Sequence, residues 1–393
     1  MDGRGHVRHY ILTYIDIEGI FISTNINMIE SWLMTLTKEH STPRAAGSMS
    51  FLDRWLAAWI FLAMAAGLLI GKVFPGIGAL LSAVEIGGIS IPIAIGLIVM
   101  MYPTLAKVRY DKTKEITTDR TLMVVSIMLN WIVGPALMFS LAWLFLPDQP
   151  ELRTGLIIVG LARCIAMVLV WSDLACGDRE ATAVLVAINS VFQILMFGVL
   201  GWFYLQILPS WLGLDTTSVT FSVVSIVTSV LVFLGMPLVA GVLSRVIGEK
   251  IKGRRWYEDT FLPKISPLAL IGLLYTIVLL FSLQGDEITA QPWTVARLAL
   301  PLLMYFAGMF FISLVVSKLS GLTYERAASV SFTAAGNNFD LAIAVSIGTF
   351  GATSPQALAG TIGPLIEVPV LVGLVYAMLW LGPKIFKKEN AGS

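Results

Sequence analysis

Arg163 and Cys164 stand side by side within a run of apolar residues that is long enough to cross a membrane. The run extends from Gly155 to Trp171 and holds no other charged residue. A charge at bilayer depth is costly, so it usually pairs with a partner or marks the path of a substrate or an ion. Neighbouring residues of a regular helix do not face one another. If the cation and the thiol act together, the helix must be irregular or a third group must join them.

Polar residues also interrupt a later apolar stretch, where Asn337, Asn338 and Asp340 follow one another closely. The two amides either line a site or only satisfy the backbone of a broken helix. A carboxylate within a span faces the protein interior, where it pairs or titrates. Asp340 is therefore a candidate proton carrier, or else the partner of Arg163.

Glu367 is the second candidate proton carrier. It lies between Pro364 and Pro369 in an apolar stretch, and two prolines so close together favour a kink. Its carboxylate either serves proton coupling or only satisfies the opening at the kink. Cys164 also has two readings, since a buried free cysteine often acts as a small apolar residue.

The remaining polar groups narrow the possible chemistry. The chain has 2 cysteines, Cys164 and Cys176, which are too far apart on one helix to form a disulfide. The 3 histidines all precede the first predicted span. We therefore expect no histidine-dependent metal site or catalytic triad in the membrane, and no enzyme. Cys176, Asp173 and Asp178 are assigned to a turn. Interhelical hydrogen bonds are expected from three further residues, Asn130, Asn189 and Gln193.

Composition indicates a polytopic membrane protein, since 57% of the residues are hydrophobic, 13% are charged and the mean hydropathy is +0.83. A soluble domain carries about 25% charged residues, and a membrane span needs about 20 apolar ones. The predicted spans cover residues 52–74, 88–106, 121–146, 154–172, 180–208, 218–244, 266–283, 292–317, 327–350 and 357–381. The sequence thus predicts an all-α protein with ten transmembrane helices.

The distribution of basic residues supports this topology. With a cytoplasmic N-terminus, only Lys72, Arg153 and Arg297 of the 26 Lys and Arg residues lie in outside segments, and Arg163 lies within a span. All the others fall in inside segments, as the positive-inside rule requires. Both termini are therefore predicted to be cytoplasmic, in a plasma membrane.

The chain divides into two five-helix halves, residues 49–208 and 209–393, and the second ends in a short cytoplasmic tail. Because each half has an odd number of spans, the second is predicted to enter the membrane inverted. The interrupted spans 4 and 9 occupy matching places, which is typical of the central site of a transporter. Residues 1–48 form an N-terminal extension of unknown role.

Three motifs resemble those of the Acr3 family of arsenite efflux transporters. They begin at Gly160 (GLARCIAMVLVWSDLA), Asn337 (NNFDLAIAV) and Gly363 (GPLIEVPV), and the likeness extends from about Trp55 to Trp380. The resemblance implies the fold of the bile acid:sodium symporter relatives, with panel and core domains and crossing broken helices 4 and 9. It also implies export of arsenite, often of antimonite, in exchange for protons.

Site residues follow from the same resemblance. The essential thiol of the family maps onto Cys164, and its carboxylate maps onto Asp340, where the family usually has Glu. The family usually has Ser where this chain has Gly336. From the residues themselves, we expect Asn337 and Asn338 to hydrogen-bond the substrate, Asp340 or Glu367 to carry protons, and Arg163 to support the site. No cofactor, ATP or nucleic acid is expected, since the chain has no phosphate-binding loop. The oligomeric state is left open.

Two other functions remain open. A sodium-coupled organic-anion symporter would use Arg163 for the anion and the polar residues from Asn337 to Asp340 for sodium. A membrane receptor without transport would show no solute flux and no sensitivity to replacement of Cys164.

Overall fold

A computed structural model describes residues 56–74, 76–77, 83–86, 89–107, 119–165, 167–214, 223–290, 292–351 and 353–386. The prediction for residues 1–48 lies outside the described residues. The described part is almost entirely helical, with one small antiparallel pair of strands, β1 (Glu85–Ile86) and β2 (Ile89–Ser90).

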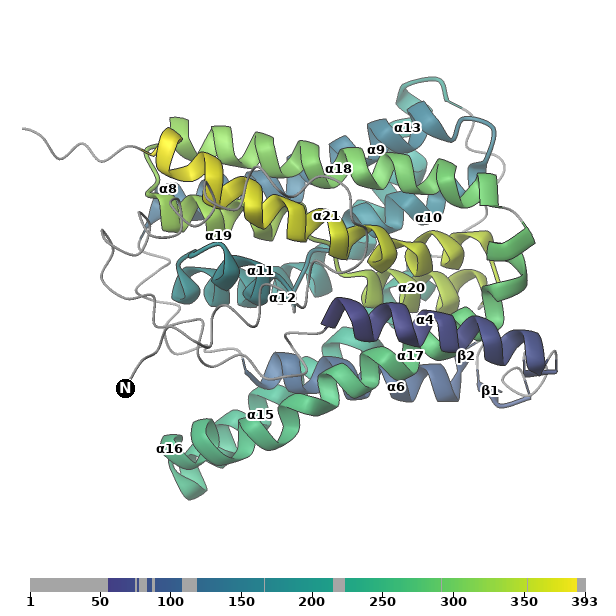
Figure 1. Cartoon of the computed structure of the whole chain (residues 1–393), viewed down its shortest axis with the longest axis horizontal. Helices are drawn as coiled ribbons and strands as arrows, with labels where there is room; N and C mark the ends of the chain where they lie inside the picture. The colour runs from purple at the N-terminus through teal and green to yellow at the C-terminus, as the bar shows by residue number, and fades with distance from the viewer. Residues whose placement is uncertain are drawn as a thin grey trace, which may run out of the picture. The chain divides into compact units, whose positions relative to one another are not determined.

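The helices follow one another along the chain as Figure 1 shows. The first half contains α4 (Leu56–Val73), α6 (Ile91–Ala106), α8 (Arg120–Met128), η2 (Leu129–Val133), α9 (Gly134–Phe145), α10 (Pro150–Leu161), α11 (Val168–Leu174), α12 (Arg179–Trp202), η3 (Phe203–Ile207) and α13 (Leu208–Trp211). The second half contains α14 (Val223–Val230), η4 (Leu231–Gly235), α15 (Met236–Lys252), α16 (Arg254–Trp256), η5 (Tyr257–Phe261), α17 (Leu262–Ala290), α18 (Pro292–Leu319), α19 (Tyr324–Ala335), α20 (Phe339–Phe350) and α21 (Pro355–Ile385).

Within the described residues, every predicted span contains one helix or a succession of two or three helical segments. Within the described residues, 6 helices are long and apolar enough to cross a membrane. Shorter apolar helices lie at Ala58–Val73, Ile91–Ala106 and Phe339–Phe350. The prediction of a polytopic helical membrane protein is therefore confirmed, whereas the count of ten spans and the inverted repeat stay predictions.

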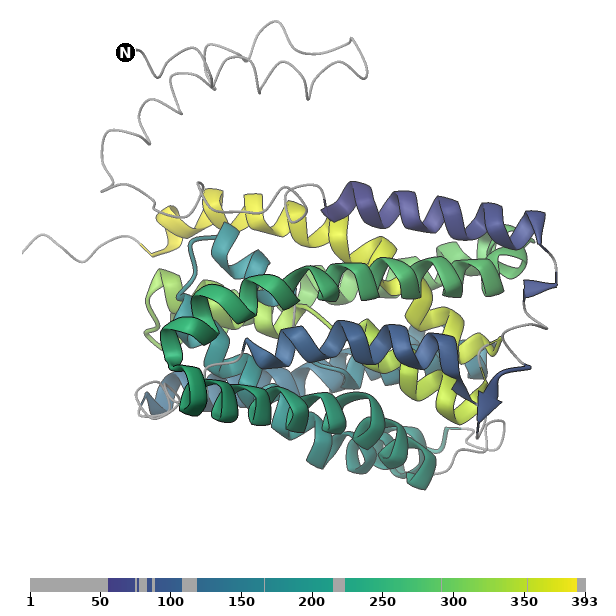
Figure 2. The same cartoon turned by 90° about the horizontal axis from the view of Figure 1, so that it is seen from below.

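One group of helices packs by close backbone contact. In this glycine-packed group (α4, α6, α15 and α17), α17 contacts α4 and α6, and α6 contacts α15. A Cβ atom on Gly67 would lie 2.6 Å from the carbonyl oxygen of Val278, and one on Gly71 would lie 2.4 Å from that of Ser282. These two glycines of α4 are spaced as in the Gly-x-x-x-Gly motif, which lets membrane helices approach closely. Figure 2 shows α4, α17 and α6 side by side in one layer.

A second group contains the interrupted helices. In this crossing group (α9 to α12 and α18 to α21), α10 packs on α9, α20 and α21, while α19 packs on α12 and α18. Helix α14 lies against α12 and α20, whereas α15, beyond η4, lies against α6. The segment α14–η4–α15 therefore passes from one group to the other.

Each of the four described π-helical segments (η2 to η5) ends two positions before a proline, with one residue in between. The residue between the segment and the proline donates its N–H to the carbonyl oxygen five positions earlier. Gly134 donates to Leu129 in this way, and Met236 donates to Leu231. Proline has no N–H and clashes with the carbonyl four residues earlier, and a wider turn relieves that clash. These four prolines thus coincide with the places where the helices change pitch, whereas prolines inside α17, α18 and α21 leave the helix regular.

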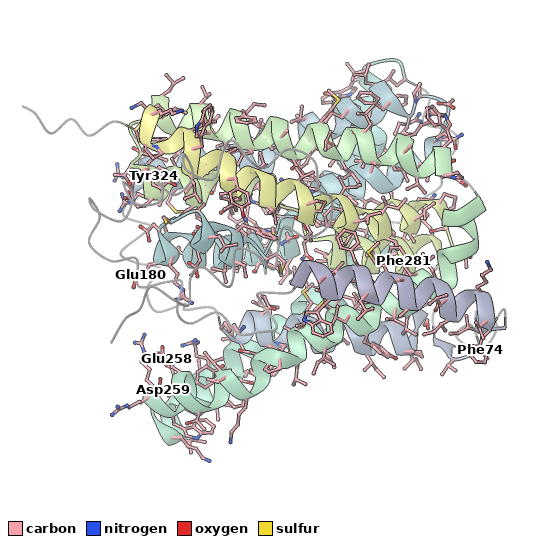
Figure 3. All side chains as sticks on the ribbon, viewed as in Figure 1. Phe74, Glu180, Glu258, Asp259, Phe281 and Tyr324 are labelled. Carbon is pink, nitrogen blue, oxygen red and sulfur yellow. The ribbon has the colours of Figure 1, made fainter. Side chains whose placement is uncertain are left out.

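The two ends of the described helices are marked by labelled residues in Figure 3. Figure 3 shows Glu180 and Tyr324 at one end and Phe74 at the other. Tyr324 fixes the first of these ends, since its hydroxyl donates to the carbonyl oxygen of Ala175 at 2.9 Å.

Candidate functional site

Two broken helices meet at their breaks. Helix α10 ends at Leu161 and α11 begins at Val168, while α19 ends at Ala335 and α20 begins at Phe339. The N–H of Cys164 donates to the carbonyl oxygen of Gly336 (3.3 Å), and that of Asn338 donates to Ala162 (2.9 Å). These bonds place Arg163 opposite Asn337 in an antiparallel bridge. The predicted interruptions are confirmed, and the backbone groups that they free bond one another.

Arg163 holds the ends of both broken helices. Its guanidinium is fully buried and donates to the carbonyl oxygen of Gly160 and, at 3.4 Å, to that of Ala334. In uninterrupted helices these carbonyls would accept from Cys164 and Asn338, whose N–H groups instead cross to the other break. Both carbonyls lie in the last turn of a helix, where the helix dipole is negative.

The predicted carboxylate partner of Arg163 is not found. Within the described residues no Asp or Glu lies within ion-pairing distance of its guanidinium. Its third partner is the hydroxyl of Tyr305 on α18, at 2.7 Å. Gly134 makes room for the group, since a Cβ atom there would lie 2.6 Å from Nη1. Two helix ends and a phenol thus take the place of a countercharge, which makes Arg163 a supporting residue of the crossing.

Asn337 and Asn338 each use one side-chain atom for the fold. Asn337 donates from Nδ2 to the carbonyl oxygen of Val159 (3.0 Å), and Oδ1 of Asn338 accepts from the N–H of Leu341 (3.1 Å) as the N-cap of α20. The other atoms, Oδ1 of Asn337 and Nδ2 of Asn338, are buried without a hydrogen-bond partner in the described part of the chain. One acceptor and one donor therefore remain for a bound molecule.

Cys164 and Glu367 converge on Gly336. A Cβ atom on Gly336 would lie 3.4 Å from Cys164 Sγ and 3.4 Å from Glu367 Oε1. Both side chains are buried, with exposed fractions of 3% and 5%. Glu367 Oε1 accepts the N–H of Asn337 (3.2 Å). This oxygen therefore satisfies a backbone group at the break between α19 and α20, and not one freed by a kink in its own helix. Helix α21 continues past Pro364 and Pro369 from Pro355 to Ile385.

Asp340 lies at the edge of this arrangement. It occupies the first turn of α20, and its side chain is only partly buried. It lies two residues after Asn338, the N-cap of α20. The crossing therefore brings all six predicted site residues to one region, four of them on the two breaks.

Three further residues contribute to the crossing, of which only Gln193 was predicted from the sequence, as the source of an interhelical hydrogen bond. Gln193 on α12 accepts the N–H of Arg163 through Oε1 at 2.9 Å, so it supports the break and not only helix packing. Tyr305 carries no sequence signal beyond its place in an apolar helix. Phe339 packs its ring on Gly363, where a Cβ atom would lie 1.7 Å from Cε1. The glycine of the third motif is the signal that could have indicated this contact.

Most of the predictions for polar residues outside the crossing are confirmed. Asn189 donates to Asn130 (3.4 Å) and accepts from Trp131 (3.1 Å), so the predicted interhelical bonds are confirmed. Cys176 lies in the predicted turn and is a free, exposed thiol. Asp178 caps α12, whereas Asp173 belongs to α11 and not to the turn.

The crossing combines four chemical features in one buried place. It holds one thiol, one carboxylate, one free amide donor and one free amide acceptor, and the backbone ends are satisfied by Arg163 and Gln193. Crossed half-helices in a membrane bundle are typical of solute-binding centres. The fold and the site together define a multi-pass membrane protein built around a central polar crossing.

Comparison with known proteins identifies the family. The Sodium Bile acid symporter family matches residues 94–291. The chain is 75% identical over 354 residues to the arsenical-resistance protein Acr3 of Corynebacterium glutamicum, covering 90% of this chain and 96% of that protein. It is 33% identical over 337 residues to an arsenical-resistance protein Acr3 of Alkaliphilus metalliredigens, covering 83% and 92%. An uncharacterized transporter of Synechocystis is 34% identical over 351 residues, covering 84% and 89%.

The chain belongs to the Sodium Bile acid symporter family, and within it to the Acr3 arsenical-resistance proteins. The predicted resemblance is confirmed. So is the prediction that the protein is a transporter and not an enzyme, because these are families of transporters.

Proposed function

We propose that this protein exports trivalent arsenic, as arsenite and as antimonite, across the plasma membrane in exchange for protons. The observation that carries the proposal is the buried Cys164 thiol at the helix crossing. A Cβ atom on Gly336 would lie 3.4 Å from both Cys164 Sγ and Glu367 Oε1, so the thiol and the carboxylate approach the same place beside this glycine. The relatives named for arsenical resistance support the choice of solute.

The chemistry of the solute fits the crossing. Arsenite near neutral pH is an uncharged trihydroxide with a thiophilic centre. The Cys164 thiol forms one sulfur–arsenic bond while a proton and an arsenic-bound hydroxyl leave as water, and the reverse step releases the solute. Arsenic stays trivalent throughout. A single thiol holds the solute weakly enough for release, and the free atoms of Asn337 and Asn338 bond its other hydroxyls.

Asp340 and Glu367 carry the exchanged proton in this scheme. Exchange of a neutral solute for one proton moves one charge, which at about 150 mV supplies roughly 3.5 kcal/mol. This free energy supports roughly a several-hundred-fold concentration gradient, since about 1.4 kcal/mol corresponds to a factor of ten. No ATP is needed.

Alternating access completes the mechanism. We take the interrupted helices as spans 4 and 9 of ten, in a 5+5 inverted repeat with both termini cytoplasmic. They rock with the crossing group against the glycine-packed group. The close packing of α4 and α17 supports treating that group as one rigid body.

Replacement of Cys164 tests the proposal. In everted vesicles energised by a pH gradient, Cys164→Ala should lower arsenite uptake by at least about tenfold, equivalent to about 1.4 kcal/mol of lost transition-state binding. Cys176→Ser, at the exposed thiol, is the matched control and should retain uptake. Full uptake by the Cys164→Ala protein would contradict the role of the thiol.

Two further measurements separate the alternatives. Asp340→Asn or Glu367→Gln should abolish the dependence of uptake on the pH gradient, and unchanged coupling in both variants would reject the carboxylate scheme. Uptake of an organic anion driven by sodium would instead identify a sodium-coupled symporter, as the family name suggests. Absence of any flux would favour a receptor.

A further inference from the structure

The two breaks free backbone carbonyl oxygens inside the helix bundle. In transporters with interrupted helices, such carbonyls and the C-terminal ends of half-helices coordinate a coupling ion, which is sodium in many of them. The name of the family also implies a sodium ion. The partners of these carbonyl oxygens therefore decide whether a sodium ion fits among them.

Some of these oxygens are bound by the breaks themselves. The carbonyl oxygens of Ala162 and Gly336 each accept an N–H group from the opposite break. The carbonyl oxygen of Val159 accepts from Nδ2 of Asn337 at 3.0 Å. These three oxygens are engaged in holding the broken helices together.

The Arg163 guanidinium binds two more oxygens, one at each helix end. It donates to the carbonyl oxygen of Gly160 in the last turn of α10, and at 3.4 Å to that of Ala334 in the last turn of α19. It also donates to the hydroxyl of Tyr305 at 2.7 Å. All three partners are oxygen atoms, and carbonyl oxygens are also ligands for a dissolved alkali cation. A fixed positive charge thus lies where a coupling cation would be coordinated.

The guanidinium leaves no place for a sodium ion among these oxygens. Arg163 is fully buried, and a Cβ atom on Gly134 would lie 2.6 Å from its Nη1 and 3.2 Å from the hydroxyl oxygen of Tyr305. Glu367 accepts the N–H of Asn337 and does not pair with the guanidinium. The sodium ion that the family name implies therefore does not fit at these helix ends, because a side chain already supplies the cation.

We infer that Arg163 is a positioning residue that takes the place of a coupling sodium ion, so that transport by this chain does not require sodium. The inference rests on the proposed arsenite function. A cation tethered to the crossing cannot move down a concentration gradient, so a sodium gradient supplies no energy and proton exchange remains the source. Because its ligands are oxygens, loss of the side chain opens a site that a dissolved monovalent cation can fill.

The experiment uses purified protein reconstituted in vesicles and energised by a pH gradient. Initial rates of arsenite uptake are measured in sodium chloride and in N-methylglucamine chloride, at equal concentration on both sides of the membrane. The intact protein should give the same rate in both salts. In N-methylglucamine, Arg163→Ala should lower the rate by at least about tenfold, because two buried carbonyl oxygens lose their donor.

Added cations should then reverse the loss. Sodium, or guanidinium at millimolar concentration, should restore most of the rate of Arg163→Ala, whereas N-methylglucamine is too large to enter the vacated place. Arg163→Lys keeps a tethered cation, so it should remain active without sodium and should gain nothing from it.

Arg153→Ala is the matched control. Arg153 is also buried and also donates to two carbonyl oxygens, those of Leu146 and Pro147, but it binds the end of α9 and not the crossing. Its removal should leave the ratio of the rates in the two salts unchanged. An equal effect of sodium on Arg153→Ala and Arg163→Ala would show a general response to loss of a buried arginine, and would overturn the inference.

Thermal unfolding in detergent tests the inference without transport. A ligand that binds only the folded protein raises its unfolding temperature. Relative to N-methylglucamine, sodium should raise the unfolding temperature of Arg163→Ala and leave that of the intact protein unchanged.

The outcomes separate the inference from the proposed function. Dependence of the intact protein on sodium, or no response of Arg163→Ala to sodium in either measurement, would overturn the inference. Failure of the intact protein to transport arsenite in both salts would overturn the proposed function, and the unfolding temperatures would still decide the role of Arg163.

Discussion

At the scale of single residues, the crossing depends on groups that do two things at once. Asn337 and Asn338 each satisfy freed backbone with one atom and leave another unused. Arg163 binds the carbonyl oxygens of two helix ends that the breaks set free. An unsatisfied buried polar group costs about 1–3 kcal/mol, so these bonds are needed before the breaks can exist inside a membrane.

The contact between Phe339 and Gly363 gives a residue-scale prediction. Gly363→Ala would place a methyl group 1.7 Å from Phe339 Cε1, so the ring must move, and Asn338 moves with it because it directly precedes Phe339. We expect a loss of about 1–3 kcal/mol in the free energy of unfolding, the usual cost of an overpacked core, together with a loss of arsenite uptake. Thermal unfolding in detergent and vesicle uptake measure the two effects.

A second substitution should reverse this loss. Phe339→Leu shortens the side chain that meets Gly363, so the double variant should recover stability relative to Gly363→Ala alone. Additive destabilisation in the double variant would show that the two residues do not act through their contact.

At the scale of helices, the sequence allows prediction of where elements break but not of what the breaks contact. Polar residues in apolar stretches mark the interruptions near Arg163 and Asn337, and proline marks the π-helical turns. The partner of Arg163 could not be predicted, because its carbonyl ligands carry no side-chain signal and Tyr305 lies far away in the sequence. Glu367 was predicted to carry a proton or to satisfy a kink, and its role as acceptor of the Asn337 N–H could not be predicted, because it depends on the register between α21 and the broken helix.

Two arginines that the positive-inside pattern leaves outside have structural roles at the end of α9. Arg153 donates to the carbonyl oxygens of Leu146 (3.1 Å) and Pro147 (2.9 Å), and Arg297 donates to that of Phe145 (3.0 Å). Arg297 also binds Asp148, with Nη1 2.9 Å from Oδ2. Cations at a helix C-terminus offset its dipole, which gives both arginines a structural reason to lie at the end of α9.

The pair formed by Asp148 and Arg297 predicts a pH dependence. The hydrogen bonds from Arg297 lower the pKa of the Asp148 carboxyl from 3.8 to about 2. A lowered pKa in the folded state adds stability above pH 3.8, and this stability is lost as the pH falls through about 2. Asp148→Asn should therefore unfold at a slightly lower temperature than the parent protein at pH 7, and the difference should shrink below pH 4. The effect is small because the pair is exposed to solvent.

Asp173→Asn is a suitable comparison, since burial raises the pKa of that carboxyl even though Arg179 lies 3.5 Å away. Loss of its charge should not destabilise the protein at neutral pH. An equal loss of stability in both variants at pH 7 would indicate that Asp148 acts by its shape and not by its charge.

At the scale of the whole molecule, the two helix groups differ in how closely they meet. Gly67 and Gly71 bring α4 against the backbone of α17, so the glycine-packed group is fixed by its own atoms. Contact with the crossing group is made largely through α14, which packs on α12 and α20. The two repeats predicted from the sequence do not coincide with these two groups, because the helices of each group come from both halves of the chain.

A cross-link between α12 and α14 tests relative motion of the two groups. A Cβ atom on Gly201 would lie 3.5 Å from Cδ1 of Ile226, so side chains at these two positions face each other between α12 and α14. In a Cys176→Ser background, oxidation of the Gly201→Cys/Ile226→Cys protein should block arsenite uptake. Reduction should restore it, because the cross-link ties α12 of the crossing group to the segment that leads into α15. Each single-cysteine variant is the control and should respond to neither treatment. Full uptake by the oxidised protein, with cross-linking verified by its mobility on a gel, would show that transport needs no movement between α12 and α14.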